Sequence, residues 1–150
     1  MKTARQILAA KAHQNTVSVA PSSTVYQALQ MMADANIGAI LVMEGDKLVG
    51  IFSERDYARK VVLMGKTSAG TPVSEIMTHK LLCVPPDATT DQCMGLMTEK
   101  RIRHLPVLEN NRVLGILSIG DLVHEKIADQ EFTIEQIGRA SCRERVYVLV

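Results

Sequence analysis

Two short segments of this chain carry a serine and an aspartate at the same spacing. Residues 50–56 (GIFSERD) and 115–121 (GILSIGD) share the pattern Gly-apolar-apolar-Ser-x-x-Asp. Each Ser ends an apolar run typical of a strand, and each Asp falls in the first turn of the helix expected next. A carboxylate in that place can accept hydrogen bonds from both hydroxyls of a ribose. The helix N-terminus beside it favours a phosphate, so the pattern is consistent with nucleotide binding.

Helix capping is the alternative explanation of the same pattern. Ser-x-x-Asp is a variant of the capping box, and an acidic residue in the first turn suits the helix dipole. Capping accounts for either copy taken alone. It does not fully account for two copies that both follow Gly-apolar-apolar at the end of a strand.

The two motifs belong to a longer internal repeat. A shift of 65 residues aligns residues 19–56 with 84–121 without a gap, and twelve of these 38 positions are identical. One unit of this size cannot bury much core alone, whereas two units can close on each other. Any site formed by the unit is therefore expected twice.

Local patterns predict the elements of each unit. Thr24 with Gln27, and Thr89 with Gln92, form capping boxes that start helices with apolar residues at helical spacing. Short strands are expected before these helices, hairpins after them, and a further helix after each motif serine. The predicted strands are 17–19, 39–43, 48–52, 82–84, 105–108 and 113–117. The predicted fold is α/β (α+β), with two β-α-β-β-α repeats packed as a pseudo-two-fold pair.

The chain divides as follows on this interpretation. Residues 1–65 form the first repeat, with 4–11 as its N-terminal lead-in, and 66–80 form a Gly/Ser/Thr-rich linker that ends in a short lead-in helix at 73–77. Residues 81–129 form the second repeat, and 130–150 form a C-terminal extension.

Composition excludes several functional classes. The net charge of +1 and the scarcity of aromatic residues (two Phe, three Tyr, no Trp) argue against nucleic acid as a partner. No apolar run approaches membrane-spanning length, so we expect no membrane partner, and the first residues are not typical of a signal peptide. Three widely spaced cysteines fit a reducing, cytoplasmic location.

We expect no enzyme activity and no metal site. The sequence has no nucleophile–base constellation, no Walker A loop and no Rossmann fingerprint. His104 has no companion at ligand spacing among His13, His79 and His124.

The chain resembles a tandem pair of cystathionine-β-synthase (CBS) domains, also called a Bateman module. The resemblance covers residues 16–129 and rests on both Ser-x-x-Asp motifs, on HLPV at 104–107 and on VSEIM at 73–77. It implies two clefts that bind an adenosyl ligand such as AMP, ADP, ATP, NAD(H) or S-adenosylmethionine, and it implies a homodimer. No catalytic cofactor is implied.

The resemblance also implies roles for individual residues. Asp56 and Asp121 would hold ribose hydroxyls, helped by Ser53 and Ser118. Backbone groups would meet adenine: Thr16–Val17 and Ala39–Ile40 in the first cleft, and Leu81–Leu82 and His104–Leu105, followed by Pro106, in the second.

The two clefts are not expected to be equivalent. Arg55 in the first motif is replaced by Gly120 in the second, and Arg103 and His104 stand where the first repeat has Gly38 and Ala39. We expect Arg55 to bind a phosphate. Arg103 either reaches a phosphate across the interface between the repeats or is a solvated side chain at a helix end.

The last residues do not fit the repeat. Residues 137–146 (IGRASCRERV) correspond to the translation of a common sequencing-adapter read, so we expect 137–150 to be an artefact and 129–136 to be the stub of a natural helix.

These observations predict a regulatory module that senses adenine nucleotides and transmits the ligand state to a partner or to its own dimer. The alternative is a structural or dimerisation module whose ligand sites are vestigial.

Overall fold

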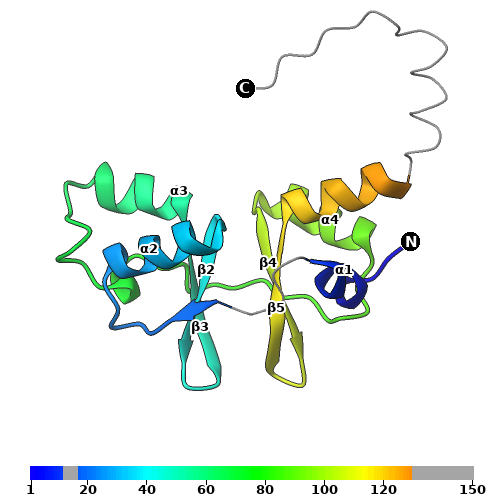
Figure 1. Ribbon diagram of the computed structural model, residues 1–150, viewed down its shortest axis with the longest axis horizontal. Coiled ribbons are helices and arrows are strands. Elements are labelled where there is room, and N and C mark those ends of the chain that lie inside the picture. The colour runs from blue at the N-terminus through cyan, green and yellow to red at the C-terminus, as the bar shows by residue number, and fades with distance from the viewer. Residues whose placement is uncertain (12–16, 130–150) are drawn as a thin grey trace, which may run out of the picture.

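The structure is a computed structural model, and it describes residues 1–11 and 17–129. Each repeat is built on an antiparallel hairpin, and the two hairpins stand next to each other in the centre of the molecule (Figure 1). The first repeat contains β1 (Ser18–Val19), α2 (Val25–Ala35), β2 (Ala39–Glu44) and β3 (Lys47–Ser53). The second contains α4 (Thr90–Lys100), β4 (His104–Glu109) and β5 (Arg112–Ser118). The predicted pair of repeats is confirmed.

A further helix follows each hairpin, as predicted. In the first repeat α3 (Glu54–Asp56) runs on into the π-helical segment η1 (Tyr57–Val62). In the second repeat residues 119–129 are helical up to the end of the described chain. Both helices therefore begin directly after a motif serine.

Strand pairing follows the same register in both repeats. β2 pairs antiparallel with β3 and β4 with β5, and each ladder shifts register at the equivalent place, Val42/Met43 and Val107/Leu108. β1 pairs parallel with β2. The predicted strand at 82–84 is reduced to one bridge between Val84 and Val107. Pro85 and Pro86 follow it, and they have no N–H with which to extend a ladder.

Both predicted capping boxes are present. The Thr24 and Thr89 hydroxyls accept hydrogen bonds from the backbone N–H of Gln27 and Gln92, at 3.1 and 3.2 Å. Each glutamine side chain accepts in return from the threonine N–H. The helices that they start bury the predicted apolar faces: Val25, Ala28, Met32, Thr90, Cys93 and Met97.

The helix α1 (Ala4–Ala10) packs on the second repeat, so the expectation that residues 4–11 lead into the first repeat is wrong. The Ala4 N–H donates to the Ala88 carbonyl oxygen at 2.8 Å, and Ile7 is buried in the core of the second repeat. Figure 1 shows α1 beside β5.

The equivalent place in the first repeat is already filled by the segment that contains the 3₁₀ turn η2 (Val73–Glu75). Val73, Ile76 and Met77 from this segment lie in the core of the first repeat. We call residues 3–11 and 72–80 the two arms. Each arm completes the core of a repeat, and no room remains for α1 on the first repeat.

A third buried cluster joins the two repeats. Ala39, Leu41 and Ile51 of the first repeat pack with Leu81, Val113 and Ile116 of the second. Packing of the hairpins against each other brings each repeat to the edge of the other's motif helix.

Candidate functional site

Asp56 caps the helix that it begins. Its Oδ2 accepts hydrogen bonds from the Ser53 N–H and the Ser53 hydroxyl, both at 3.0 Å, and its own N–H donates to Ser53 Oγ at 3.2 Å. The capping interpretation of the motif is therefore realised. It does not exclude ligand binding, because the Asp56 side chain lines a cleft.

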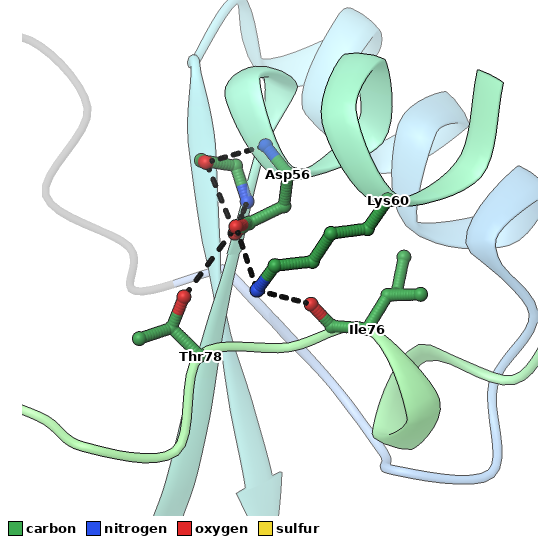
Figure 2. Close-up of polar contacts among 5 residues, drawn as sticks. Asp56, Lys60, Ile76 and Thr78 are labelled. Carbon is green, nitrogen blue, oxygen red and sulfur yellow. Dashed lines mark hydrogen bonds and ion pairs between the residues drawn. The ribbon is translucent and has the colours of Figure 1, made fainter. Parts of the chain in front are cut away.

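The other oxygen of Asp56 is also engaged. Lys60 Nζ lies 3.2 Å from Asp56 Oδ1, and the Thr78 hydroxyl donates to the same oxygen at 3.4 Å. Figure 2 shows Lys60 between this carboxylate and the Ile76 carbonyl oxygen, to which it donates at 3.3 Å. Lys60 thus ties the motif helix to the arm 72–80. At neutral pH the positive charge of Lys60 also offsets the negative charge of the Asp56 carboxylate.

Asp121 repeats the cap with a different cation. Its Oδ2 accepts from the Ser118 N–H at 2.8 Å, and its N–H donates to Ser118 Oγ at 3.1 Å. Lys11 Nζ lies 3.0 Å from the same Oδ2 and donates to the Ile116 carbonyl oxygen at 3.0 Å. Here the lysine comes from the arm 3–11 and not from the motif helix.

Each motif lines a cleft that is built by both repeats. We name the cleft of about 560 Å³ around Ser53, Arg55 and Asp56 the Asp56 cleft. The cleft of about 750 Å³ around Ser118 and Asp121 is the Asp121 cleft. Both volumes suit a ligand the size of a nucleotide.

The Asp56 cleft is strongly basic. Arg55, Lys80, Arg101 and Arg103 line it, against two acidic residues, Glu54 and Asp56. None of these four cations forms an ion pair within the part of the chain that the structure describes. Cations without a carboxylate partner are free to bind an anion, and guanidinium groups suit phosphate oxygens in particular.

The Asp121 cleft is balanced in charge. Arg5 and Lys11 line it together with Asp121 and Glu125. Arg5 is ion-paired with Glu109 and Lys11 with Asp121, so the cations of this cleft already have partners. The two clefts thus differ in their unpaired positive charge.

The structure groups the expected site residues differently from the sequence-based hypothesis. Leu82 and His104, which we expected in a separate second cleft, line the cleft of Asp56, and Arg103 of the second repeat lines it as well. Val17 and Ala39, expected beside Asp56, line the cleft of Asp121. The exchange follows from the pseudo-two-fold packing, which sets the strand edge of one repeat against the motif helix of the other.

Three expected residues lie in the protein interior instead. Ile40 belongs to the core of the first repeat and Leu105 to the core of the second, and neither lines a cleft. Pro106 is buried within β4, where its carbonyl oxygen accepts from the Val84 N–H at 3.0 Å. Thr16 lies outside the described residues, as do residues 130–150 with the suspected artefact.

Several cleft residues were not predicted, and most belong to the arms. The structure adds Thr78 and Lys80 to the Asp56 cleft, and Arg5 and Lys11 to the Asp121 cleft. A second alignment would have found the lysines, because residues 3–11 (TARQILAAK) match 72–80 (PVSEIMTHK) at a shift of 69. The arms thus form a repeat of their own, whose shift differs from the shift of the main repeat.

His104 lines both clefts. Its ring lies over Gly38, the residue that Arg103 replaces in the second repeat, and Gly38 also lines both clefts. Burial lowers the pKa of the His104 imidazole below its ordinary value, and the carboxylate of Asp121 opposes this shift. The ring is therefore neutral at neutral pH. Together with Gly38 it forms a wall that the two clefts share.

Within residues 1–11 and 17–129, no group of three or more His, Cys, Asp or Glu side chains is placed to hold a metal ion. None of the helices described there is long and apolar enough to cross a membrane.

Comparison with known proteins gives a consistent match. The model of the CBS domain matches this chain twice, at residues 5–63 and 73–127. The mitochondrial CBS domain-containing protein CBSX3 of Arabidopsis thaliana is 39% identical over 119 residues, which are 76% of this chain. The chain spans 58% of the length of that relative.

Solved structures show the same architecture. A CBS-domain protein of Burkholderia ambifaria MC40-6 is 51% identical, with a TM-score of 0.82, over 86% of this chain and 96% of that chain. The CBS domain pair of MJ0100 is 23% identical, with a TM-score of 0.76, over 86% of this chain and 98% of that chain. MJ0100 was solved in complex with 5′-methylthioadenosine and S-adenosyl-L-methionine.

Proposed function

The chain belongs to the CBS-domain family as a tandem CBS pair, and from this we propose that it is a regulatory module that binds adenine nucleotides in its two clefts. One observation carries the proposal. The Asp56 cleft combines a ribose-type carboxylate at a helix start with four cations that have no ion pair in the described chain. AMP, ADP, ATP and NAD(H) all offer a ribose joined to phosphate.

The contacts assign roles within this proposal. Asp56 and Asp121, each held by its serine, accept the ribose hydroxyls, and Arg55 and Arg103 hold phosphate oxygens in the Asp56 cleft. Leu82 and His104 form the wall beside the base in the Asp56 cleft. Val17 and Ala39 form the corresponding wall in the Asp121 cleft. That the same fold holds adenosyl ligands in MJ0100 is compatible with these roles.

Ligand binding would act on the arrangement of the two repeats. Arg55 and Asp56 come from the first repeat, whereas Arg103 and His104 come from the second, so one ligand contacts both. A ligand that binds one arrangement better shifts the population toward it. At about a hundredfold its Kd, it stabilises that arrangement by about 2.7 kcal/mol. A partner protein, or a second copy of the chain, would bind one arrangement of the repeats better than the other.

A structural or dimerisation role is the second candidate, and one observation favours it. Capping and the lysines Lys60 and Lys11 already occupy much of the hydrogen-bonding capacity of Asp56 and Asp121. Carboxylates that serve the fold in this way could persist in clefts that no longer bind a ligand.

Isothermal titration with AMP, ATP, NADH and S-adenosylmethionine separates the two candidates. We expect ATP to bind the wild-type chain, and Asp56→Ala to weaken it by about 10–100-fold, because charge-assisted hydrogen bonds are lost. The control Asp46→Ala, at an exposed hairpin turn, should leave the affinity unchanged. Absence of binding by all four ligands at about 1 mM would favour the structural role. An Asp56→Ala chain that binds like the wild type would refute the site.

A further inference from the structure

The helix position one turn after each motif aspartate carries opposite charges in the two repeats. The shift of 65 residues aligns Lys60 with Glu125, four residues after Asp56 and Asp121 respectively. Residues four apart on a helix lie on the same face, so each side chain borders its own ribose-type carboxylate. This difference was not among those that the sequence motifs revealed.

In the first repeat the position is satisfied. Lys60 is ion-paired with Asp56 and donates to the Ile76 carbonyl oxygen, and Asp56 has partners on both of its oxygens. The unpaired groups that line the Asp56 cleft are mainly positive: Arg55, Lys80, Arg101 and Arg103, against the exposed Glu54. The lining of this cleft therefore carries an excess of unpaired positive charge.

In the second repeat the position is not satisfied. Glu125 is only 6% exposed, and its Oε2 lies 3.2 Å from Lys2 Nζ. Its Oε1 is buried and has no hydrogen-bond partner. A buried acceptor without a donor destabilises a protein and is rare in native structures. Glu125 lines the Asp121 cleft, whose own cations Arg5 and Lys11 are already paired with Glu109 and Asp121. No described lysine or arginine that lines this cleft is therefore left to pair with Oε1.

We propose that the Asp121 cleft selects a nucleoside whose ribose end carries a protonated amine, and that Glu125 accepts its N–H. A phosphate in the same place would face the carboxylates of Asp121 and Glu125 instead. The two clefts would thus sort nucleosides by the charge of the 5′ substituent, with anions in the Asp56 cleft and cations in the Asp121 cleft. The inference rests on the proposed function, because it assumes that Asp121 holds a ribose.

Three probes test the inference directly: 5′-amino-5′-deoxyadenosine, adenosine and AMP. They share adenine and ribose, and they are respectively cationic, neutral and anionic at neutral pH. Titration into the full-length Asp56→Ala chain reports the Asp121 cleft. We expect the amine to bind at least about tenfold more tightly than AMP, as for a charge-assisted hydrogen bond to a buried carboxylate. Adenosine should lie between them.

Variants of Glu125 then identify the acceptor. Glu125→Gln in the same background should reduce the preference for the amine to less than about threefold, whereas Glu99→Gln, on the exposed face of α4, should not change it. If Glu125→Gln does not fold, Lys2→Met removes the cation that competes for the carboxylate, and it should raise the preference for the amine.

Three outcomes overturn the inference. They are equal or tighter binding of AMP, a preference that survives Glu125→Gln, and a preference that Lys2→Met lowers. Failure of all three probes to bind, while ATP binds the wild-type chain, overturns the Asp121 site alone. Failure of every nucleotide to bind the wild-type chain overturns the proposed function as well.

Discussion

Ser53 and Asp56 form a helix cap, and under the proposed function the same two residues also serve a ligand site. Asp56 uses Oδ2 for the helix cap and Oδ1 for Lys60 and Thr78, so a ribose must share or displace a contact. The hydrogen bond from Thr78, at 3.4 Å, is the longest of these, so we expect a ribose to displace it first. The sequence predicts this dual role because both functions require the same local geometry.

His104 gives the molecule a pH-dependent stability. Burial lowers its pKa from the ordinary value of 6.5, so the unfolded chain binds a proton more readily than the folded one. The free energy of unfolding should therefore fall as the pH decreases from about 7.5 through 6.5. Urea denaturation at about pH 7.5 and pH 5.5 measures the loss.

The His104→Gln chain should lose less stability over this range than the wild type, whereas His79→Gln, at an exposed position, should lose as much. An identical pH dependence in wild type and His104→Gln would show that another group is responsible.

At the scale of elements, each arm completes the core of one repeat. Gly50 and Gly115 lie directly against the arms. A Cβ at these positions would lie 2.5 Å from Met77 Sδ and 2.9 Å from a Leu8 methyl carbon. The identity of both glycines is thus explained by close packing of the arms, which the motif pattern alone did not reveal.

Loss of arm packing should loosen one repeat and not the other. Ile7→Ala opens the core of the second repeat, where Cys93 is buried, and should cost about 2–5 kcal/mol. Labelling of Cys93 by a thiol reagent should accelerate, in a chain whose other two cysteines are replaced by serine. The matched variant Ile76→Ala opens the core of the first repeat, which contains no cysteine.

Ile76→Ala should leave Cys93 labelling much less affected. Equal acceleration by both variants would mean that the two cores unfold as one unit. Acceleration by Ile76→Ala alone would contradict the assignment of the arms.

The elements themselves could be predicted, whereas the packing of α1 on the second repeat and the lining of the clefts could not. Capping boxes, hairpins and the motif helices depend on residues close in sequence, such as Thr24 with Gln27. The place of α1 depends on contacts such as Ala4 with Ala88, which no local pattern encodes. Cleft composition depends in turn on how the repeats pack, and for that reason Arg101 was missed.

For the whole molecule, the two motif helices lie on the same side (Figure 1), and each carries exposed apolar residues. Val62 and its equivalent Ile127 are 54% and 53% exposed, and Leu63 and Val123 are exposed beside them. Since both repeats expose the same position, a second copy related by a two-fold axis could cover both helices at once.

We therefore expect a homodimer that Val123→Lys with Ile127→Lys converts to a monomer, because buried lysines in the interface would be unpaired. Light scattering after size exclusion measures the mass. The control Tyr26→Lys changes an exposed apolar residue on α2, outside these helices. A wild-type monomer, or a double variant that remains dimeric, would place the contact elsewhere.

The arms also set the order in which the two repeats can fold during synthesis. Every described part of the first repeat, its arm included, lies between residues 17 and 80, so its core can close while the rest is still being translated. The arm 3–11 leaves the ribosome about a hundred residues before Leu105, Leu117 and Leu122, which bury it. Until then Ile7 and Leu8 remain without their partners. The second repeat is thus assembled from the two ends of the described chain around a half that is already folded.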